Sequence, residues 1–231
     1  PSDLVTKFCN ADFDETAIAP RWIQFLEEVF LDPEVRHFAW KAAGYSISGD
    51  MGEEVFFFLY NSGRNGKSKF IGAIYEVLGD YAETGGQKLF IANDKGEDPK
   101  NEKAKIVGTR FLRGPETEGK QKLNMRVIKD ITGGDSLDAE AKYEHPFTFK
   151  PVCKLWIVGN HKPVITDTGA AIWDRVRLIP FERYFEPHER DPDLEQKLRA
   201  ETSGILNWLI QGCLLWQKEG LNAPEKLKNA V

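Results

Sequence analysis

The stretch Val55-Phe56-Phe57-Phe58-Leu59-Tyr60-Asn61-Ser62-Gly63-Arg64-Asn65-Gly66-Lys67-Ser68 decides the fold of this chain. Its first six residues form a continuous apolar run, which is typical of a strand buried on both faces. A turn rich in Gly and Asn follows, and apolar residues then recur at helical spacing from Phe70 up to Gly79. Strand, glycine loop and helix in this order predict the first half of an α/β unit.

The turn matches the phosphate-loop pattern GxxxxGK[ST] except at its first glycine, which is Asn61. Asn is one of the few residues that enter left-handed backbone space easily, so we expect the loop to tolerate it. In such a loop backbone N–H groups cradle phosphates, the lysine reaches the terminal phosphates, and the serine hydroxyl ligates Mg²⁺. The nucleotide-binding residues are therefore predicted to be Asn61, Ser62, Gly63, Arg64, Asn65, Gly66, Lys67 and Ser68.

Two further apolar strands end at polar residues. The strand beginning at Arg110 runs into Glu116, and the strand from Leu155 to Val158 runs into Gly159-Asn160. We assign Glu116 to the Mg²⁺ shell through water and Glu118 to the general base that polarises the attacking water, and the reverse assignment stays open. Asn160 supplies a neutral amide that can hold this water and sense the γ-phosphate.

A third strand pattern, residues 176–181, follows Trp173-Asp174-Arg175. A guanidinium delivered from a neighbouring subunit would stabilise the transferring phosphoryl group. We favour Arg175 for this role over Arg177, because Arg177 lies within the strand pattern itself.

The chain divides into a helical lead-in (1–50), an α/β core (51–190) and a C-terminal helical segment (191–231). The lead-in contains one helix behind Pro20 and a second that Gly44 is expected to end. In the core, 93–105 reads as a polar connection, Leu123 to Ile131 as a helix, and 147–149 as the returning arm of a hairpin. The C-terminal segment is predicted to be one helix from Leu194 to about Lys218.

Composition excludes several classes of protein. The 231 residues are 41% hydrophobic, and 31 basic against 36 acidic side chains give a net charge of −5. A disordered tail, a collagen-like chain, a disulfide scaffold and a nucleic-acid binder that relies on bulk positive charge are thereby excluded. The three cysteines have no metal-ligand spacing, and no apolar stretch approaches the ~20 residues that span a bilayer. No secretory signal is present, so a cytoplasmic location is expected.

Five ordered motifs resemble the phage and plasmid primase-helicase family, within superfamily III of the helicases. They are 58–68 with Gly66-Lys67-Ser68, Pro115-Glu116-Thr117-Glu118-Gly119, 128–135 ending in Gly133-Gly134-Asp135, 154–163 with Gly159-Asn160, and 173–181 with Trp173-Asp174-Arg175. The resemblance covers nearly the whole chain. It implies an AAA-plus-like P-loop NTPase fold, with a central parallel sheet flanked by helices, and ATP with Mg²⁺ as cofactors.

The same resemblance implies partners. It implies a homo-hexameric ring with ATP at the subunit interfaces, single-stranded DNA in the pore, and a primase part on the same full-length chain, in keeping with a start at Pro1. It makes Asn160 the sensor, Arg175 the trans-acting finger, and Lys129 a further residue that reaches a neighbour's phosphates. If the source is a phage, the location is the host cell cytoplasm.

The pore hairpin departs from the family pattern, because Glu140 stands where a basic residue is common. We expect Lys142, two residues on and on the same strand face, to substitute for it, with Lys150 as a second DNA contact. Residues 100–150 carry eleven Lys/Arg against eight Asp/Glu, a balance of +3 that leaves −8 for the rest of the chain. A local surface of this kind can steer a phosphate backbone.

The sequence therefore predicts an ATP-dependent DNA helicase domain, an enzyme that hydrolyses ATP in the replication of a phage, plasmid or mobile element. Two alternatives stay open: a non-catalytic assembly module that binds ATP and DNA, and a small-molecule kinase built on the same phosphate loop.

Overall fold

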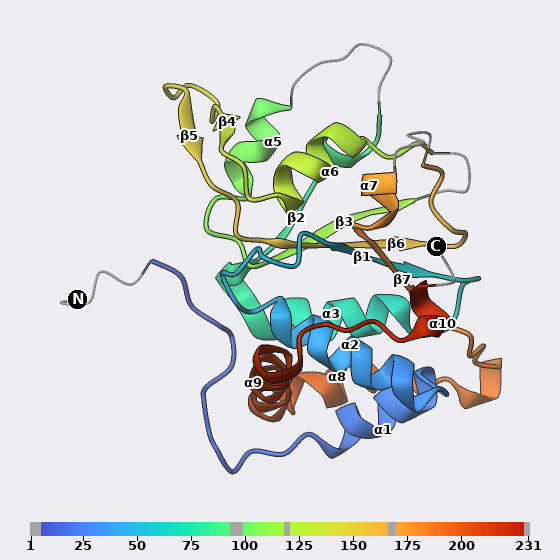
Figure 1. Ribbon diagram of the computed structural model, residues 1–231. Coiled ribbons are helices and arrows are strands. Elements are labelled where there is room, and N and C mark those ends of the chain that lie inside the picture. Colours follow the sequence, from blue (N-terminus) through green and yellow to red (C-terminus); the bar gives the residue numbers. More distant parts are fainter. Residues whose placement is uncertain (1–5, 93–98, 118–120, 166–169, 229–231) are drawn as a thin grey trace.

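A parallel five-stranded sheet with the order β2-β3-β6-β1-β7 forms the centre of the molecule (Figure 1). The computed structural model describes residues 6–92, 99–117, 121–165 and 170–228. The strands are β1 (Phe56–Tyr60), β2 (Ala82–Thr84), β3 (Phe111–Thr117), β6 (Lys154–Gly159) and β7 (Val176–Pro180). A separate antiparallel hairpin joins β4 (Leu137–Ala139) to β5 (Phe147–Phe149). The predicted α/β fold with a central parallel sheet is confirmed, as are its four predicted core strands, which are β1, β3, β6 and β7, and the hairpin.

Helices cover both faces of the sheet (Figure 1). One face carries α1 (Pro20–Val29), α2 (Pro33–Tyr45), α3 (Lys67–Leu78), α8 (Leu194–Arg199), α9 (Thr202–Glu219) and α10 (Glu225–Lys228). The other carries α4 (Gln87–Phe90), α5 (Lys100–Lys105), α6 (Met125–Thr132) and α7 (Ala170–Trp173). Short 3-10 helices occupy Gly79–Tyr81 and Pro187–Glu189. The helical lead-in and the C-terminal helices therefore share one layer.

Successive side chains of β1 point to opposite faces of the sheet, so the strand contributes to two separate hydrophobic cores. Phe57 and Leu59 pack with the layer of α1, α2 and α3, whereas Phe56 and Phe58 pack with the layer of α4 and α6. All four side chains are fully buried. The ring of Phe57 stacks on Trp156 of β6 with centroids 4.3 Å apart. Because both faces of β1 are covered, every position of the strand must be apolar, which explains the unbroken run in the sequence.

Gly44 does not end α2, contrary to the prediction. The helix continues to Tyr45, and Gly44 lies where α2 crosses α9. A Cβ at this position would stand 2.1 Å from the backbone carbon of Gly212 and 2.1 Å from the backbone nitrogen of Cys213. The glycine is there for the close approach of two helix backbones, and nothing in its local sequence distinguishes this role from that of a helix end.

The single C-terminal helix predicted from Leu194 is also wrong, because α8 ends at Arg199 and α9 begins at Thr202. Glu201 lies in the break and turns its carboxylate to the first turn of α1, where it accepts hydrogen bonds of 2.9 Å from the backbone N–H groups of Arg21 and Trp22. Ala19 at the N-cap of α1 has no side chain for this purpose. A distant carboxylate thus caps α1.

Other differences are local. The polar connection predicted at 93–105 contains the helix α5 from Lys100, while 93–98 lie outside the described residues. Lys142 is not on a strand face as predicted: β4 ends at Ala139, and Lys142 lies in the hairpin turn, where Glu144 N–H donates to Ala141 O over 3.0 Å. The short edge strand β2 has no apolar run and was not predicted.

Candidate functional site

The phosphate loop joins β1 to α3 at the carboxyl edge of the sheet, and its backbone is left-handed at three places. Asn61 has φ 112°, Arg64 has φ 63° and Gly66 has φ 92°. The expectation that Asn61 tolerates this region is confirmed. Asn is enriched at positive φ because its short polar side chain bonds locally, and here Asn61 Oδ1 accepts from the N–H of Ser62 over 2.9 Å.

Gly66 is required for a second reason, which is its contact with the helical lead-in. A Cβ on Gly66 would lie 2.6 Å from Val29 Cγ1 and 3.2 Å from the ring of Phe25, both on α1. The loop therefore rests directly on α1. Asn65 ties the loop to the strand on its other side, because its Nδ2 donates to Phe181 O over 3.1 Å. These contacts hold the loop in place without a ligand.

The Lys67 ammonium lies among the oxygens of the loop. Its Nζ donates to Asn61 O, to Asn65 Oδ1 over 3.1 Å and to Ser62 O over 3.4 Å. Burial lowers the pKa of Lys67, and the nearby negative charge of Glu116 partly opposes this shift. The two side chains thus share one electrostatic environment, although Lys67 begins α3 and Glu116 lies on β3.

Glu116 and Asn160 meet at the same edge of the sheet. Glu116 is exposed near the end of β3, after a register irregularity that begins at Arg113. Asn160 directly follows β6, which lies between β1 and β3, and its Nδ2 reaches Glu116 Oε1 at 3.5 Å. The structure therefore brings Lys67, Glu116 and Asn160 together. Glu118, the predicted general base, lies outside the described residues.

Ser68 is exposed in the first turn of α3, beside this group. Among the described residues, no group of three or more His, Cys, Asp or Glu side chains could hold a metal ion. A Mg²⁺ ion held by Ser68 and Glu116 would need phosphate and water oxygens to complete its shell, which is how Mg²⁺ usually binds beside nucleotides.

The Arg175 side chain is not part of this group. It precedes β7 at the amino edge of the sheet, where its guanidinium pairs with the Glu54 carboxylate at 2.7 Å and donates to Thr132 Oγ1 at 3.0 Å. The five residues of β1, at ~3.3 Å each, separate the two edges by about 17 Å. Arg177 lies within β7 and donates to the Asp174 carbonyl at 2.6 Å. Neither arginine reaches the phosphate loop of its own chain.

The remaining predicted site residues lie on the side of the sheet that carries α4 to α7. Lys129 is half-buried in the last turn of α6. Lys142 lies in the turn of the hairpin with its ammonium 4.9 Å from the ring centre of Tyr143, and that ring is 93% exposed. Lys150 is exposed just after β5. The hairpin projects away from the central sheet (Figure 1).

A hollow of about 220 Å³ adjoins the phosphate loop, and the sequence reasoning did not identify it. Arg64 and Gly66 line it from the loop, Phe25 from α1, and Phe185 and Leu194 from the chain after β7. These positions carry no motif, and Phe25 reads as an ordinary core residue in the helical pattern. The only available signal was the cluster of aromatic and basic residues that follows β7.

The parallel sheet with helices on both faces makes this a mixed α/β chain, and its loop after β1 and its polar group lie at the carboxyl edge of that sheet. Residues 59–175 match the family model DUF5906, a family of unknown function, and the chain belongs to that family. In the described part, no helix is long and apolar enough to cross a bilayer.

Relatives come from large DNA viruses. "Putative helicase L207/L206" of Acanthamoeba polyphaga mimivirus is 28% identical over 219 residues, which is 87% of this chain and 23% of that protein. "Putative helicase 022R" of Frog virus 3 (isolate Goorha) is 29% identical over 248 residues, covering 99% of this chain and 25% of that protein. The chain thus spans about a quarter of the length of these relatives.

The solved structure described as "The apo structure of NrS-1 C terminal region (305-718)" has the same fold, with a TM-score of 0.71 at 13% identity, over 96% of this chain and 52% of that one. Together with the viral relatives, it confirms the resemblance to a superfamily III-like primase-helicase family. Both of these viral relatives carry the name of a helicase.

Proposed function

We propose that this chain is the ATP-hydrolysing motor domain of a DNA helicase. The observation that carries the proposal is the meeting of Lys67, Glu116 and Asn160 at one edge of the sheet, beside a phosphate loop. A cation for the phosphates, a carboxylate for Mg²⁺ and a neutral amide for the attacking water are the groups that phosphoryl transfer to water requires.

In this proposal the phosphate loop binds ATP. The Lys67 ammonium exchanges its contacts with the loop oxygens for the β- and γ-phosphates, while Ser68 and Glu116 hold Mg²⁺. The hollow lined by Phe25 and Phe185 lies against Gly66 and offers apolar surface to the base of the nucleotide. Asn160 orients the water. Glu118 remains the proposed general base because it follows β3 by one residue.

The position of Arg175 supports hydrolysis between copies of the chain. Its guanidinium lies at the amino edge, about one strand length from the loop of its own chain, so Arg175 could reach a γ-phosphate only in the loop of a neighbouring copy. We propose a ring of six copies, with Lys129 directed at a neighbour's phosphates, and release of the Arg175–Glu54 ion pair when two copies meet.

In such a ring the hairpin β4–β5 would face the single-stranded DNA, with Lys142 and Lys150 as contacts. Its turn combines a lysine with the exposed ring of Tyr143, a combination that suits a stacked base and its phosphate. A primase part on the same full-length chain, replication of a viral or mobile element, and a location in the host cytoplasm complete the proposal.

DNA-stimulated ATP hydrolysis tests the proposal. We expect Lys67→Ala to abolish hydrolysis and Glu116→Gln to abolish it while ATP still binds. The matched control is Lys228→Ala, which removes a surface lysine paired with Glu225 at 2.7 Å and should hydrolyse ATP like the wild type. Equal hydrolysis by wild type and Lys67→Ala would refute the site. Unwinding by Glu116→Gln would favour a non-catalytic module, and transfer of the γ-phosphate to a metabolite would favour a kinase.

The proposed assembly has its own test. Mass measurement with a non-hydrolysable ATP analogue and single-stranded DNA should give six copies. In this proposal an Arg175→Ala copy inactivates the site of its neighbour, whereas a Lys67→Ala copy inactivates its own site. In mixed rings, sites that combine the intact Lys67 of one variant with the intact Arg175 of the other should be active. An equal mixture of the two variants should therefore recover part of the hydrolysis. An absence of recovery in a preparation shown to contain mixed rings would contradict the trans role of Arg175.

A further inference from the structure

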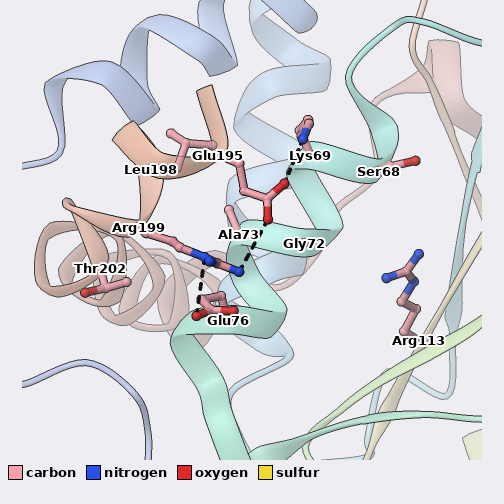
Figure 2. Close-up of a pocket in the computed structure, with 10 residues that line it drawn as sticks. All are labelled: Ser68, Lys69, Gly72, Ala73, Glu76, Arg113, Glu195, Leu198, Arg199 and Thr202. Carbon is pink, nitrogen blue, oxygen red and sulfur yellow. Dashed lines mark hydrogen bonds and ion pairs between the residues drawn. The ribbon is translucent and has the colours of Figure 1, made fainter. Parts of the chain in front are cut away.

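Arg113 lies in a second hollow beside the phosphate-loop helix, and no role follows for it from the sequence motifs. This hollow, about 270 Å³, runs along α3 from Ser68 to Glu76 and is closed by α8 and the start of α9. Arg113 enters it from β3, three residues before Glu116. In Figure 2 the guanidinium extends from the strand along the flank of α3, in the direction of Ser68.

The other charged side chains in the hollow neutralise one another. Lys69 pairs with Glu195 at 2.9 Å, and Arg199 pairs with Glu195 at 3.3 Å and with Glu76 at 3.6 Å (Figure 2). The guanidinium of Arg113 differs from these, because within the described part of the chain no hydrogen bond or ion pair engages it. Arg113 is half-buried, so its five N–H donors are only partly solvated. A half-buried guanidinium in this state gains from an anion that can bind it through two oxygens.

The shape of α3 leaves a path between Arg113 and the phosphate loop. The helix presents Gly72 and Ala73 to the hollow, and a Cβ added at Gly72 would meet no atom within 4 Å. Ser68, at the upper end of this path, is in the first turn of α3, where the proposed phosphates and Mg²⁺ would lie. The anion that fits both ends of the path is therefore the phosphate chain of a nucleotide in the loop.

We propose that Arg113 contacts the terminal phosphate of the bound nucleoside triphosphate from within the same chain. The inference rests on the proposed nucleotide site and deepens it, since it makes Arg113 the group that distinguishes triphosphate from diphosphate. An arginine that acts within one chain stabilises charge on the γ-phosphate without waiting for a neighbouring copy. Arg175 would then add a second guanidinium only when copies assemble, so nucleotide recognition and hydrolysis would depend on different arginines.

Equilibrium binding of a non-hydrolysable ATP analogue and of ADP tests this inference. Arg113→Ala should weaken the triphosphate analogue about tenfold or more while ADP affinity changes less than about threefold. Arg113→Lys should recover part of the loss, because a lysine keeps the charge but lacks the planar fork. Arg36→Ala, which removes another half-buried arginine on the distant helix α2, should change neither affinity.

The outcomes separate this inference from the proposed function. If wild type binds both nucleotides and Lys67→Ala binds neither, the nucleotide site stands. If Arg113→Ala then keeps the wild-type ratio of the two affinities, the role of Arg113 is overturned. The role is also overturned if Arg113→Ala loses affinity for the triphosphate analogue and for ADP to the same extent. It is overturned as well if a lowered unfolding midpoint of Arg113→Ala accounts for the lost affinity. If wild type binds neither nucleotide, the proposed function itself fails.

Discussion

Replacing Gly44 by Ala tests the packing that holds the helical layer together. The added Cβ would stand 2.1 Å from two backbone atoms of α9, the carbonyl carbon of Gly212 and the amide nitrogen of Cys213. An ordinary contact needs about 3.4–4 Å, so α2 and α9 would have to separate by more than about 1 Å. Neither contact is with a flexible side chain, and the two helices also share the hydrogen bond from Trp40 Nε1 to Trp208 O at 2.7 Å.

Overpacking of this kind costs about 1–3 kcal/mol, and contact with backbone on both sides places Gly44→Ala at or above the upper end. For a chain of this length, a loss of about 3 kcal/mol lowers Tm by about 6–12 °C. The matched control is Gly72→Ala in the interior of α3, where the added Cβ meets no atom within 4 Å. Because Ala is the better helix former, this control should gain about 0.5–1 kcal/mol.

Urea unfolding followed by circular dichroism measures both variants under the same conditions. We expect changes of opposite sign, and a double variant close to the sum of the two, since Gly72 is on a different helix from Gly44. A Gly44→Ala protein within about 0.5 kcal/mol of wild type would refute the packing argument. An equal loss in both variants would show that glycine flexibility, and not the helix crossing, is what matters.

Two further predictions concern buried charge and helix capping. Burial lowers the pKa of Lys154 to about 7 in the folded protein, whereas the same group in the unfolded chain titrates near ~10.4. Between these two values the unfolded state binds more protons than the folded state. The free energy of unfolding should therefore rise with pH from about 7 to 9, by up to about 1.4 kcal/mol per pH unit. Urea unfolding across this range measures the slope, which Lys154→Met should abolish; an unchanged slope would contradict the assignment, and above pH 9 the raised pKa of Cys153 acts in the opposite direction. Glu201→Ala should destabilise the fold by about 1–2 kcal/mol because two N–H groups of α1 lose their acceptor, and Glu201→Gln should recover part of this in thermal unfolding, whereas equal stability of all three proteins would rule out the cap.

The elements that could be predicted from the sequence are those whose own residues show which of their faces are buried. Strands β1 and β6 are covered on both faces, so β1 and residues 155–158 of β6 are uninterrupted apolar runs that a short window reveals. Glu116 and Asn160 could be placed near the loop for a topological reason. Parallel strands end at a common edge, so residues that follow neighbouring strands converge whatever lies between them in the chain.

The features that escaped prediction depend on partners far away in the sequence. Gly44 looks like a helix end until α9 is placed across it, and Glu201 looks like an ordinary helical residue until α1 is placed beside it. Arg113 belongs to the same class. Its strand is recognisable from the sequence, but the hollow exists only because α3, α8 and β3 enclose it. Helical periodicity reports which face is buried and not what it is buried against.

The support of the phosphate loop comes from both ends of the chain, outside the part that matches the family model. That match spans 59–175, so it contains the loop but neither α1 nor β7. Yet Gly66 rests on Phe25 and Val29 of α1, and Asn65 is bonded to Phe181 just after β7. Since α1 is capped by Glu201 from the C-terminal segment, the loop depends on a closed series of contacts that joins residues near 25 to residues near 200. The phosphate-loop motif and the surfaces that hold it in shape therefore belong to different parts of this molecule, and a fragment limited to the matched region would keep the phosphate-loop sequence without the surfaces that set its geometry.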